Sequence, residues 1–280
     1  MPTDTRRITG PETSRSPYDY CQIEISKEEN QNELIKSDKK RKDGRLAAQL
    51  RPIFLKANVI SQARGSSYIE MGQTKVICAV YGPREVMRRE DFSLKGQLTC
   101  DFKFTTFSCR QRRQHQQDNQ EKDLSVQMLE ALEPAVCLHK YPKSQINIYA
   151  TVLQNDGSAL SAAIMCASVA LATAGIEMYD LVLASSLGVL NTVLLVDPTL
   201  QEEENIANET GKSPQNAGTM TLAFLPSLNQ VSAMTSDGQF LFDMINKSMQ
   251  QCIENCQKLY PVLQQCLVED VKEKANLTHA

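Results

Sequence analysis

The spacing of apolar residues along the first half of the chain predicts several β-strands followed by one helix. Short runs rich in β-branched and aromatic residues are bounded by turn-forming residues, so strands are expected at 52–60, 67–71, 74–81 and 97–104. Gly72 and Gln73, between the second and third runs, predict a tight hairpin. The polar segment 109–122 predicts a long loop, and apolar residues at helical spacing then predict a helix over 124–139.

The second half of the chain shows the same order of patterns. Alternation predicts a strand over 145–153, and a run of small residues predicts a helix over 161–174. Further strands are expected at 180–188, 192–197, 219–226 and 230–235. An acidic loop is expected between the strands 192–197 and 219–226. A long helix is predicted over 240–274, because its apolar residues fall on one face. Two rounds of strands and helices predict an α+β fold of two similar halves.

Composition divides the chain into an arm, a domain and a short tail. Residues 1–40 are polar and charged, which predicts a mostly extended N-terminal arm. The basic run 39–42 fits a nuclear-localisation signal, and a solvated charge cluster before a domain is an equal alternative. The main domain is expected over 41–274, and 275–280 is expected to form a C-terminal tail. The 280 residues are enough to bury a full hydrophobic core.

Charge and cysteine content limit the classes of partner. A formal net charge of −3 gives no overall basic field, so any contact with RNA would come from local basic patches. The apolar stretch 181–195 is interrupted by polar residues and predicts no membrane span. The nine cysteines form no Cys-x-x-Cys motif and no zinc-type pairing with histidine, so neither a metal site nor a cofactor is expected. Scattered cysteines are typical of reduced thiols in a cytosolic or nuclear protein.

The junction between the strand 145–153 and the helix 161–174 has the form of a phosphate site. A strand, a glycine turn and a helix present backbone N–H groups and the positive end of the helix dipole to an anion. The junction 155–160 reads Asn-Asp-Gly-Ser-Ala-Leu, with one glycine, one serine, an apolar leucine and no cation. The junction 155–160 therefore has the form of an anion site, called the anion seat below, but lacks the positive side chain that would bind the anion.

A series of motifs resembles those of the RNase PH family, in the family's order. The segment 65–85 resembles two of its strands, and 156–164 resembles its phosphorolytic loop. Shorter matches occur at 41–45, 50–53, 132–136 and 175–182, so that the resemblance covers roughly residues 41–267. It implies the RNase PH-like fold, also described as ribosomal protein S5 domain 2-like, with two pseudo-symmetric halves of strands and helices.

The resemblance also shows how the chain departs from the active members of the family. Those members hold the attacking phosphate with an arginine in the phosphorolytic loop. With the loops aligned on Asp156 and Gly157, the Thr/Ser position of the family falls on Ala159 and the arginine position on Leu160. A second family arginine would lie within 119–123, which contains none.

The metal-binding carboxylates of the active members are also incomplete in this chain. Glu203 or Glu204 could supply one carboxylate, although an acidic cluster is more often a solvated turn. The position of the second aspartate falls on Thr219. Because each lost charged hydrogen bond removes about 1.5–3 kcal/mol, we predict that the chain has no intrinsic nuclease activity.

Within the RNase PH family, the motifs are most similar to the ring subunits of the eukaryotic RNA exosome. The resemblance is narrowed to one type of ring subunit by the segments 6–12 and 259–265. It implies a structural role in a hetero-hexameric ring of RNase PH-like subunits, with S1 and KH cap proteins on one face and a separate nuclease on the other. Single-stranded RNA would pass through the channel for 3′-to-5′ processing of ribosomal RNA and decay of messenger and non-coding RNA. The expected locations are nucleus, nucleolus and cytoplasm.

Local basic residues give candidate contacts with RNA. By resemblance, the strand 101–104 and the loop after it face the central pore, and the candidates are Lys103, Arg110, Arg112 and Arg113, with Arg84 in a second basic spot. Such side chains would bind backbone phosphates without choice of sequence, and an ordinary solvated loop is the alternative. Phe107 could stack on a base, but a phenylalanine in this position is more often part of a core.

Two other functions fit part of the sequence. A phosphate-dependent 3′-exoribonuclease would carry most of the same motifs, but Leu160 and Thr219 argue against it. An α+β interaction protein with no role in RNA metabolism would fit the sequence pI of about 5.8. The long series of motifs in family order argues against this second alternative.

Overall fold

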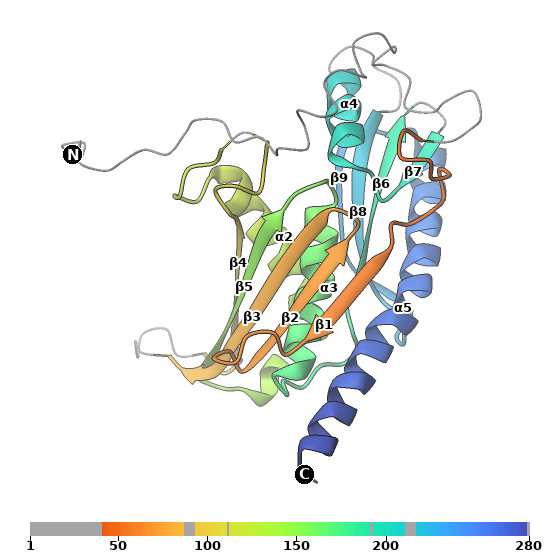
Figure 1. Cartoon of the computed structure of the whole chain (residues 1–280). Coiled ribbons are helices and arrows are strands. Elements are labelled where there is room, and N and C mark those ends of the chain that lie inside the picture. Colours follow the sequence, from red (N-terminus) through yellow and green to blue (C-terminus); the bar gives the residue numbers. More distant parts are fainter. Residues whose placement is uncertain (1–40, 87–92, 111, 191–192, 211–216, 279–280) are drawn as a thin grey trace, which may run out of the picture.

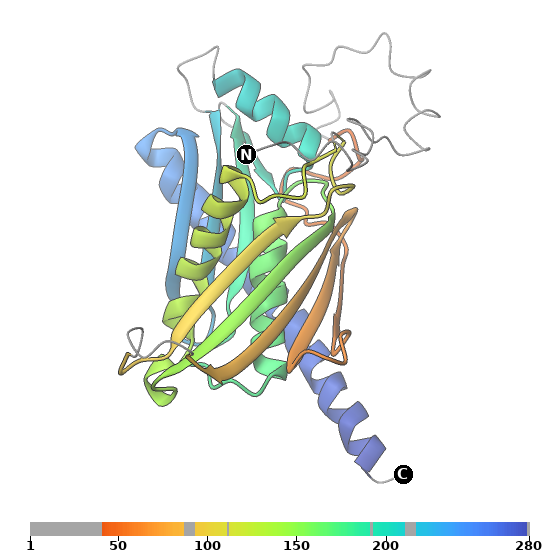
Figure 2. The same ribbon diagram turned by 90° about the vertical axis from the view of Figure 1, so that its left-hand side faces the viewer.

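The protein is a two-sheet structure with one helix at its centre. The computed structural model describes residues 41–86, 93–110, 112–190, 193–210 and 217–278, so the arm expected over 1–40 lies outside the described residues. Two β-sheets enclose α3 (Ala159–Thr173), and other helices lie along the sides and at one end (Figures 1 and 2). In the described part of the chain, no helix is long and apolar enough to cross a membrane.

The first sheet consists of β1 (Ile53–Ala57), β2 (Gly65–Met71), β3 (Thr74–Glu85), β4 (Gln97–Phe104) and β5 (Ser144–Gln154), in the order β1-β2-β3-β5-β4. Neighbouring strands are antiparallel, except that β4 and β5 run parallel. Alternate side chains, such as Val76, Val80 and Ile148, are buried against α3, while Tyr149 faces outward. This alternation is the pattern that predicted the strands.

The second sheet consists of β6 (Leu183–Leu190), β7 (Val193–Val196), β8 (Ala217–Leu225) and β9 (Gln230–Gln239), in the order β7-β6-β8-β9. All of its neighbouring strands are antiparallel. The expected strands are present in both sheets, with ends that shift by a few residues. The prediction of an α+β fold with two halves of strands and helices is therefore confirmed.

The helix α3 forms the core between the two sheets. Every residue from Ala159 to Leu171 is buried, so the helix has no polar face. A helix that is apolar on all sides is stable only when neighbours cover it completely. The sheets do so here, and α5 (Phe242–Thr278) packs against β6, β8 and β1 on the outside of the second half (Figure 1).

The prediction of an acidic loop after β7 is wrong, because this segment forms the helix α4 (Leu200–Thr210). Its first turn is stabilised by Glu202, whose Oε2 accepts a hydrogen bond from the backbone N–H of Thr199 at 2.9 Å. Ile206 is buried on its inner face, beside Leu195. A single buried apolar residue is too weak a periodic signal to predict a helix from the sequence.

Two predicted helix boundaries also differ from the structure. The helix expected over 124–139 is α2 (Asn119–Leu132), which begins inside the expected loop. A carboxylate oxygen of Glu121 accepts a hydrogen bond from the backbone N–H of Asp118 and stabilises the early start, and Pro134 follows the end of the helix. Two short 3-10 turns follow, η2 (Glu133–Ala135) and η3 (Leu138–Lys140). The last helix continues to Thr278, so 275–278 of the expected tail are helical.

Candidate functional site

The candidate site lies at the end of the molecule where β5 stops and α3 begins. The helix α4 covers this end, as Figure 1 shows. The turn after β5 is held from two sides. Its Asn155 N–H donates to the carbonyl of Ser108 at 3.0 Å, and the carbonyls of Asp156 and Gly157 accept hydrogen bonds from Arg51 at 2.9 and 3.1 Å. Ser108 of the loop after β4, Arg51 before β1 and the turn at the start of α3 therefore meet at one edge.

The start of α3 is packed closely against the start of α4. Gly157 has a φ of +85°, and a Cβ atom at this position would lie 2.6 Å from the backbone nitrogen of Leu200, so only glycine fits. The N–H of Leu200 donates to the carbonyl of Asp156 at 3.1 Å. Ser158 adopts a left-handed conformation, and its hydroxyl donates to the carbonyl of Pro198 at 3.1 Å.

A carboxylate of the chain itself occupies the anion seat. The backbone N–H of Ser158 donates to Oε1 of Glu203 at 2.8 Å, so a side chain from α4 satisfies a donor at the start of α3. Glu203 is half-buried, whereas Glu204 is exposed. Of the two glutamates considered in the sequence analysis, the structure brings only Glu203 to the seat.

The surroundings of Glu203 favour its protonated form. Burial is the main influence, and it raises the pKa of Glu203 to about 7. The hydrogen bond from Ser158 and the charge of Arg51 act in the opposite direction, while the negative charges of Asp197 and Asp156 add to the rise. The seat therefore holds an acid that changes its charge near neutral pH.

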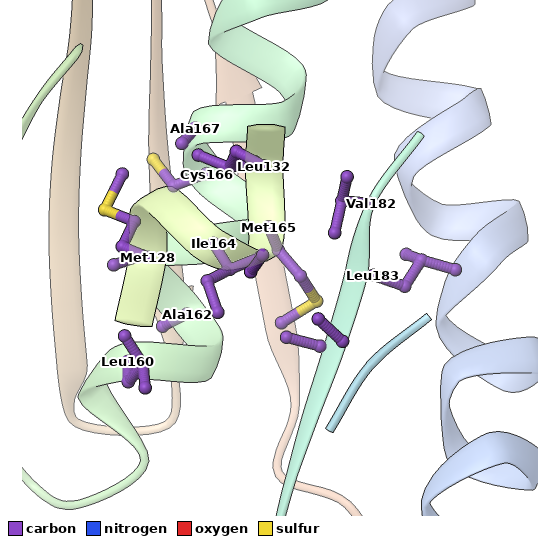
Figure 3. Close-up of a cluster of buried hydrophobic side chains, with 14 of the residues drawn as sticks. Met128, Leu132, Leu160, Ala162, Ile164, Met165, Cys166, Ala167, Val182 and Leu183 are labelled. Atoms are coloured by element: carbon purple, nitrogen blue, oxygen red, sulfur yellow. The ribbon is translucent and has the colours of Figure 1, made fainter. Parts of the chain in front are cut away.

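Leu160, where the sequence analysis expects active family members to have arginine, is part of the hydrophobic core. Leu160 is only 8% exposed and belongs to the main buried cluster, in which Figure 3 shows it on the first turn of α3 beneath Met128 and Ile164. Ala159 beside it is buried as well. An arginine at position 160 would have to place its charge in this cluster or displace the apolar side chains around it.

The position expected for the second aspartate lies within the second sheet. Thr219 of β8 pairs with Gly188 of β6 on one side and with Asp237 of β9 on the other. Asp237 is the carboxylate closest in register, and it is exposed. Among the described residues, no group of three or more histidine, cysteine, aspartate or glutamate side chains is arranged to hold a metal ion.

A buried ion pair below the seat was not among the predicted site residues. Nε of Arg51 donates to Oδ2 of Asp197 at 2.8 Å, and one of its terminal nitrogens donates to Oδ1 at 2.6 Å. Burial alone would raise the pKa of Asp197, but the hydrogen bonds and charge of Arg51, together with Arg45, hold that pKa below its usual value. The pair joins the start of β1 to the end of β7.

Two more arginines of the same segment contact the end of β7. Arg41 is fully buried and donates to the carbonyls of Ala47 and Val196, at 2.5 and 2.6 Å, and also contacts Glu202 at 3.4 Å. Arg45 donates to the backbone carbonyl of Asp197 at 3.3 Å. This arginine-rich segment resembles a motif of the family, but its contacts with residues some 150 positions away have no local signal in the sequence. A cavity of about 370 Å³ lies beside it, lined by Lys42, Asp43, Asp156, Thr199, Gln201, Glu202 and Asn205.

Three candidate RNA residues lie at this edge, and a fourth is held within the chain. Arg110 and Lys103 are exposed, Arg112 is half-buried, and Nζ of Lys103 donates to the carbonyl of His115 at 2.8 Å. By contrast, the guanidinium carbon of Arg113 lies 4.3 Å from the centre of the Phe104 ring. Arg113 also donates to Gln120 at 2.9 Å and contacts Asp118 at 3.9 Å.

The two remaining candidates are Phe107 and Arg84. Phe107 is 61% exposed, so its assignment to the core is wrong. Arg84 pairs with Gln145 at the beginning of β5, whereas the loop 105–113 follows the opposite end of the sheet. The structure therefore does not bring Arg84 together with the other basic candidates.

The chain is similar to known proteins over most of its length. The model of the 3′ exoribonuclease family, RNase PH, matches in two parts, domain 1 over residues 49–177 and domain 2 over residues 180–258. Exosome complex component MTR3 of Homo sapiens is 38% identical over 98% of this chain and 98% of the relative. The RRP41-like exosome component of Arabidopsis thaliana is 35% identical over 82% of this chain and 85% of the relative.

Solved structures with the same fold include rice (Oryza sativa) Rrp46, with a TM-score of 0.68, 24% identity, and coverage of 80% of this chain and 98% of that chain. An Archaeoglobus fulgidus exosome with RNA bound to the active site has a chain with the same TM-score and 21% identity, with coverage of 80% and 92%. At these identities the likeness concerns the fold alone. It confirms the expectation of an RNase PH-like fold.

Proposed function

The chain belongs to the 3′ exoribonuclease family, the RNase PH family, and we propose that it is a non-catalytic structural subunit of an RNA exosome ring. The relatives named MTR3 support this proposal, because the similarity extends over 98% of both chains. In this role the chain completes a hetero-hexameric ring of RNase PH-like subunits. It supports cap proteins with S1 and KH domains and forms part of the wall of the RNA channel.

The observation that carries the non-catalytic assignment is the contact between Ser158 and Glu203. An attacking phosphate would need donors and a cation at the start of α3, but the Ser158 N–H already donates to the carboxylate of Glu203 at 2.8 Å. Leu160 places an apolar side chain in the core where active family members have arginine. Negative charge and missing donors both oppose phosphate binding at this seat.

The assembly part of the proposal is supported by the edges of the sheets. In the described part of the chain, β9 pairs only with β8, and its outer side has no partner strand. Val231 and Met234 of β9 are exposed large apolar residues. An uncovered strand edge with apolar side chains favours contact with another subunit. We propose that a neighbouring RNase PH-like subunit covers this edge.

We infer the remaining parts of the proposed role from the family resemblance. A separate nuclease would degrade the RNA that passes through the ring, in 3′-to-5′ processing of ribosomal RNA and decay of messenger and non-coding RNA. The chain would act in the nucleus, the nucleolus and the cytoplasm. Lys103, Arg110 and Arg112 are the proposed contacts with RNA, at the end of the molecule where α3 begins. Arg113 is not included, because its guanidinium group packs on the Phe104 ring and donates to Gln120.

The test combines purification with an activity assay. The tagged chain is purified at low salt from the cells in which it occurs, and the proteins that accompany it are identified by mass spectrometry. We expect RNase PH-like and S1 or KH proteins, and no release of nucleoside diphosphates when the free chain is given RNA and inorganic phosphate. A well-behaved monomer without such partners would contradict the ring assignment. Phosphate-dependent release of nucleoside diphosphates would contradict the non-catalytic assignment.

A further inference from the structure

The outer face of the first sheet carries a row of aromatic and basic side chains. The helices α2 and α3 pack against the inner face, and among the described residues no helix covers the outer one (Figures 1 and 2). On this outer face lie Arg84 at one end of β3, then Tyr81 of β3 and Tyr149 of β5, and then Lys103 near the end of β4. These four residues are called the sheet track below.

Strand register places the members of the sheet track on one face. Tyr81 pairs with Asn147, two residues before Tyr149 on β5, and Tyr149 pairs with Asp101, two residues before Lys103 on β4. Because side chains alternate along a strand, residues two apart point to the same side. The track crosses β3, β5 and β4 diagonally. From the level of Gln145 to the level of Thr151, it extends about 20 Å along the strands.

The aromatic part of the track is an open stacking surface. The ring centres of Tyr81 and Tyr149 lie 5.8 Å apart with an interplanar angle of 69°, and Tyr149 is 41% exposed. The guanidinium carbon of Arg84 lies 5.3 Å from the centre of the Tyr81 ring. Protein surfaces that bind single-stranded RNA use aromatic rings and arginine planes on an open sheet to stack bases. Lysine and arginine beside them neutralise the phosphates.

The track also connects the two groups of basic residues that the fold separates. Arg84 lies at one end of the sheet, and Lys103 leads to the exposed Arg110 in the loop 105–113 at the other. A strand of RNA along the track would contact both. We propose that the sheet track binds single-stranded RNA, with Tyr81 and Tyr149 stacking bases and Arg84 and Lys103 contacting phosphates. This inference rests on the proposed function, because it names the surface by which a ring subunit holds RNA.

An acidic residue beside the sheet track allows the proposal to be tested by removing a negative charge. Asp101 is exposed and pairs with Tyr149. Its carboxylate repels a phosphate bound beside Tyr149. If RNA binds there, Asp101→Asn should tighten binding, by up to about fivefold at low salt. A surface that only contacts protein gives no reason for this change to strengthen RNA binding.

The experiment uses the assembly purified through the tagged chain and an oligouridylate probe of about 12 nucleotides. A metal chelator keeps the RNA intact, and binding is measured by fluorescence anisotropy at several salt concentrations. Tyr149→Ala should weaken binding about fivefold to 150-fold, and Tyr149→Phe should retain it, because the phenyl ring still stacks. Arg84→Ala should reduce the salt slope of log K by about one. Photocrosslinks from 4-thiouridine should map to Tyr81 or Tyr149.

The control is Tyr179→Ala, which removes a tyrosine that is 57% exposed and lies outside the sheet. Its affinity for the probe should equal that of the parent chain. Unchanged RNA binding in Tyr149→Ala would overturn the proposal. So would loss of neighbouring subunits in this variant at an unchanged unfolding temperature, since the face would then be a protein interface. Failure of the proposed function is recognised separately, by the absence of RNase PH-like proteins from the purified material.

Discussion

Glu203 accepts a hydrogen bond from the backbone N–H of Ser158, with 2.8 Å between Oε1 and the nitrogen, so α4 supplies an acceptor to the start of α3. The N–H groups at the start of a helix need acceptors, and an anion is the preferred one. In this chain Glu203 is that acceptor, and the nearby Leu160 is an apolar residue of the core. The structure therefore retains the form of an anion site, but a side chain of the same chain already accepts the hydrogen bond that an external anion would need.

Stability should depend on pH through Glu203. Its pKa is raised from 4.5 to about 7 in the folded chain, so the folded state holds this proton more tightly than the unfolded state. The contribution of the protonated acid is fully present below about pH 4.5 and is lost as pH rises towards 7. Glu203→Gln should therefore raise the free energy of unfolding by about 1–3 kcal/mol at pH 8, with little effect at pH 4.5.

Urea denaturation of the two chains at both pH values measures this difference. Glu204→Gln is the matched control, because Glu204 is the exposed neighbour on the same helix. Equal stability differences at pH 4.5 and pH 8 would show that Glu203 is not the titrating group.

Restoring the family's arginine alone should not restore phosphorolysis. Leu160→Arg would place a charge in the core and should lower the free energy of unfolding by about 2–5 kcal/mol. Glu203 would still occupy the seat, and Thr219 would still supply no carboxylate. RNA incubated with phosphate and this variant should remain intact. The control Leu160→Met, of similar volume, should lower the free energy of unfolding by less than about 1.5 kcal/mol. Phosphorolysis by Leu160→Arg would contradict the role given to Glu203 and Thr219.

The pair of Arg51 and Asp197 should be essential for stability. Arg51→Met removes the two hydrogen bonds to the buried carboxylate of Asp197 and leaves it the 3.7 Å contact with Arg45. The substitution should cost about 3–5 kcal/mol at neutral pH, measured by urea denaturation. Because the pKa of Asp197 is lowered in the folded chain, the pair stabilises the protein at pH values above the usual pKa of an aspartate. That contribution is lost as pH falls through the lowered value. The loss caused by Arg51→Met should therefore shrink at acid pH.

A double variant serves as the control for this pair. Arg51→Met with Asp197→Leu removes both charges and should recover part of the stability lost in the single variant. Additive effects of the two substitutions would show that the contact contributes little.

Two neighbouring arginines should respond differently to alanine substitution. Arg110 is exposed, so Arg110→Ala should weaken RNA binding by the assembly and lower the salt slope by about one, without changing the unfolding temperature. Arg113 stacks on Phe104 and contacts Gln120, so Arg113→Ala should lower the unfolding temperature and leave the salt slope unchanged. Anisotropy titrations and thermal unfolding check both. The reverse result would mean that Arg113 reaches RNA.

Assembly should depend on the edge strand β9. Met234→Lys places a charge on an exposed apolar position of this edge and should reduce recovery of neighbouring subunits. The free energy of unfolding of the chain itself should change by less than about 0.5 kcal/mol. Val268→Lys, an exposed apolar position on α5, is the matched control and should co-purify normally. Normal assembly of the β9 variant would place the neighbour elsewhere.

Much of the fold could be predicted from the chain, because its strands and long helices are periodic. Alternating residues place Val76 and Ile148 in the core without knowledge of the fold. The helix α4 could not be predicted, because Ile206 is its one buried apolar residue and its start depends on a hydrogen bond from Thr199 to Glu202. The exposure of Phe107 could not be predicted either, because the residues next to it in the sequence do not indicate that the loop directs its side chain outward.

The sequence by itself determined the order of strands and helices, the family and the lack of an arginine at Leu160, since each depends on residue types at short spacing. Only the tertiary structure decided what each charge does. Glu203 reaches Ser158 from 45 positions away, and the fold holds Arg113 on its own Phe104 while it separates Arg84 from the other basic residues. Packing of distant segments sets the partners and burial of a charged group, and these determine whether it binds, stabilises or titrates.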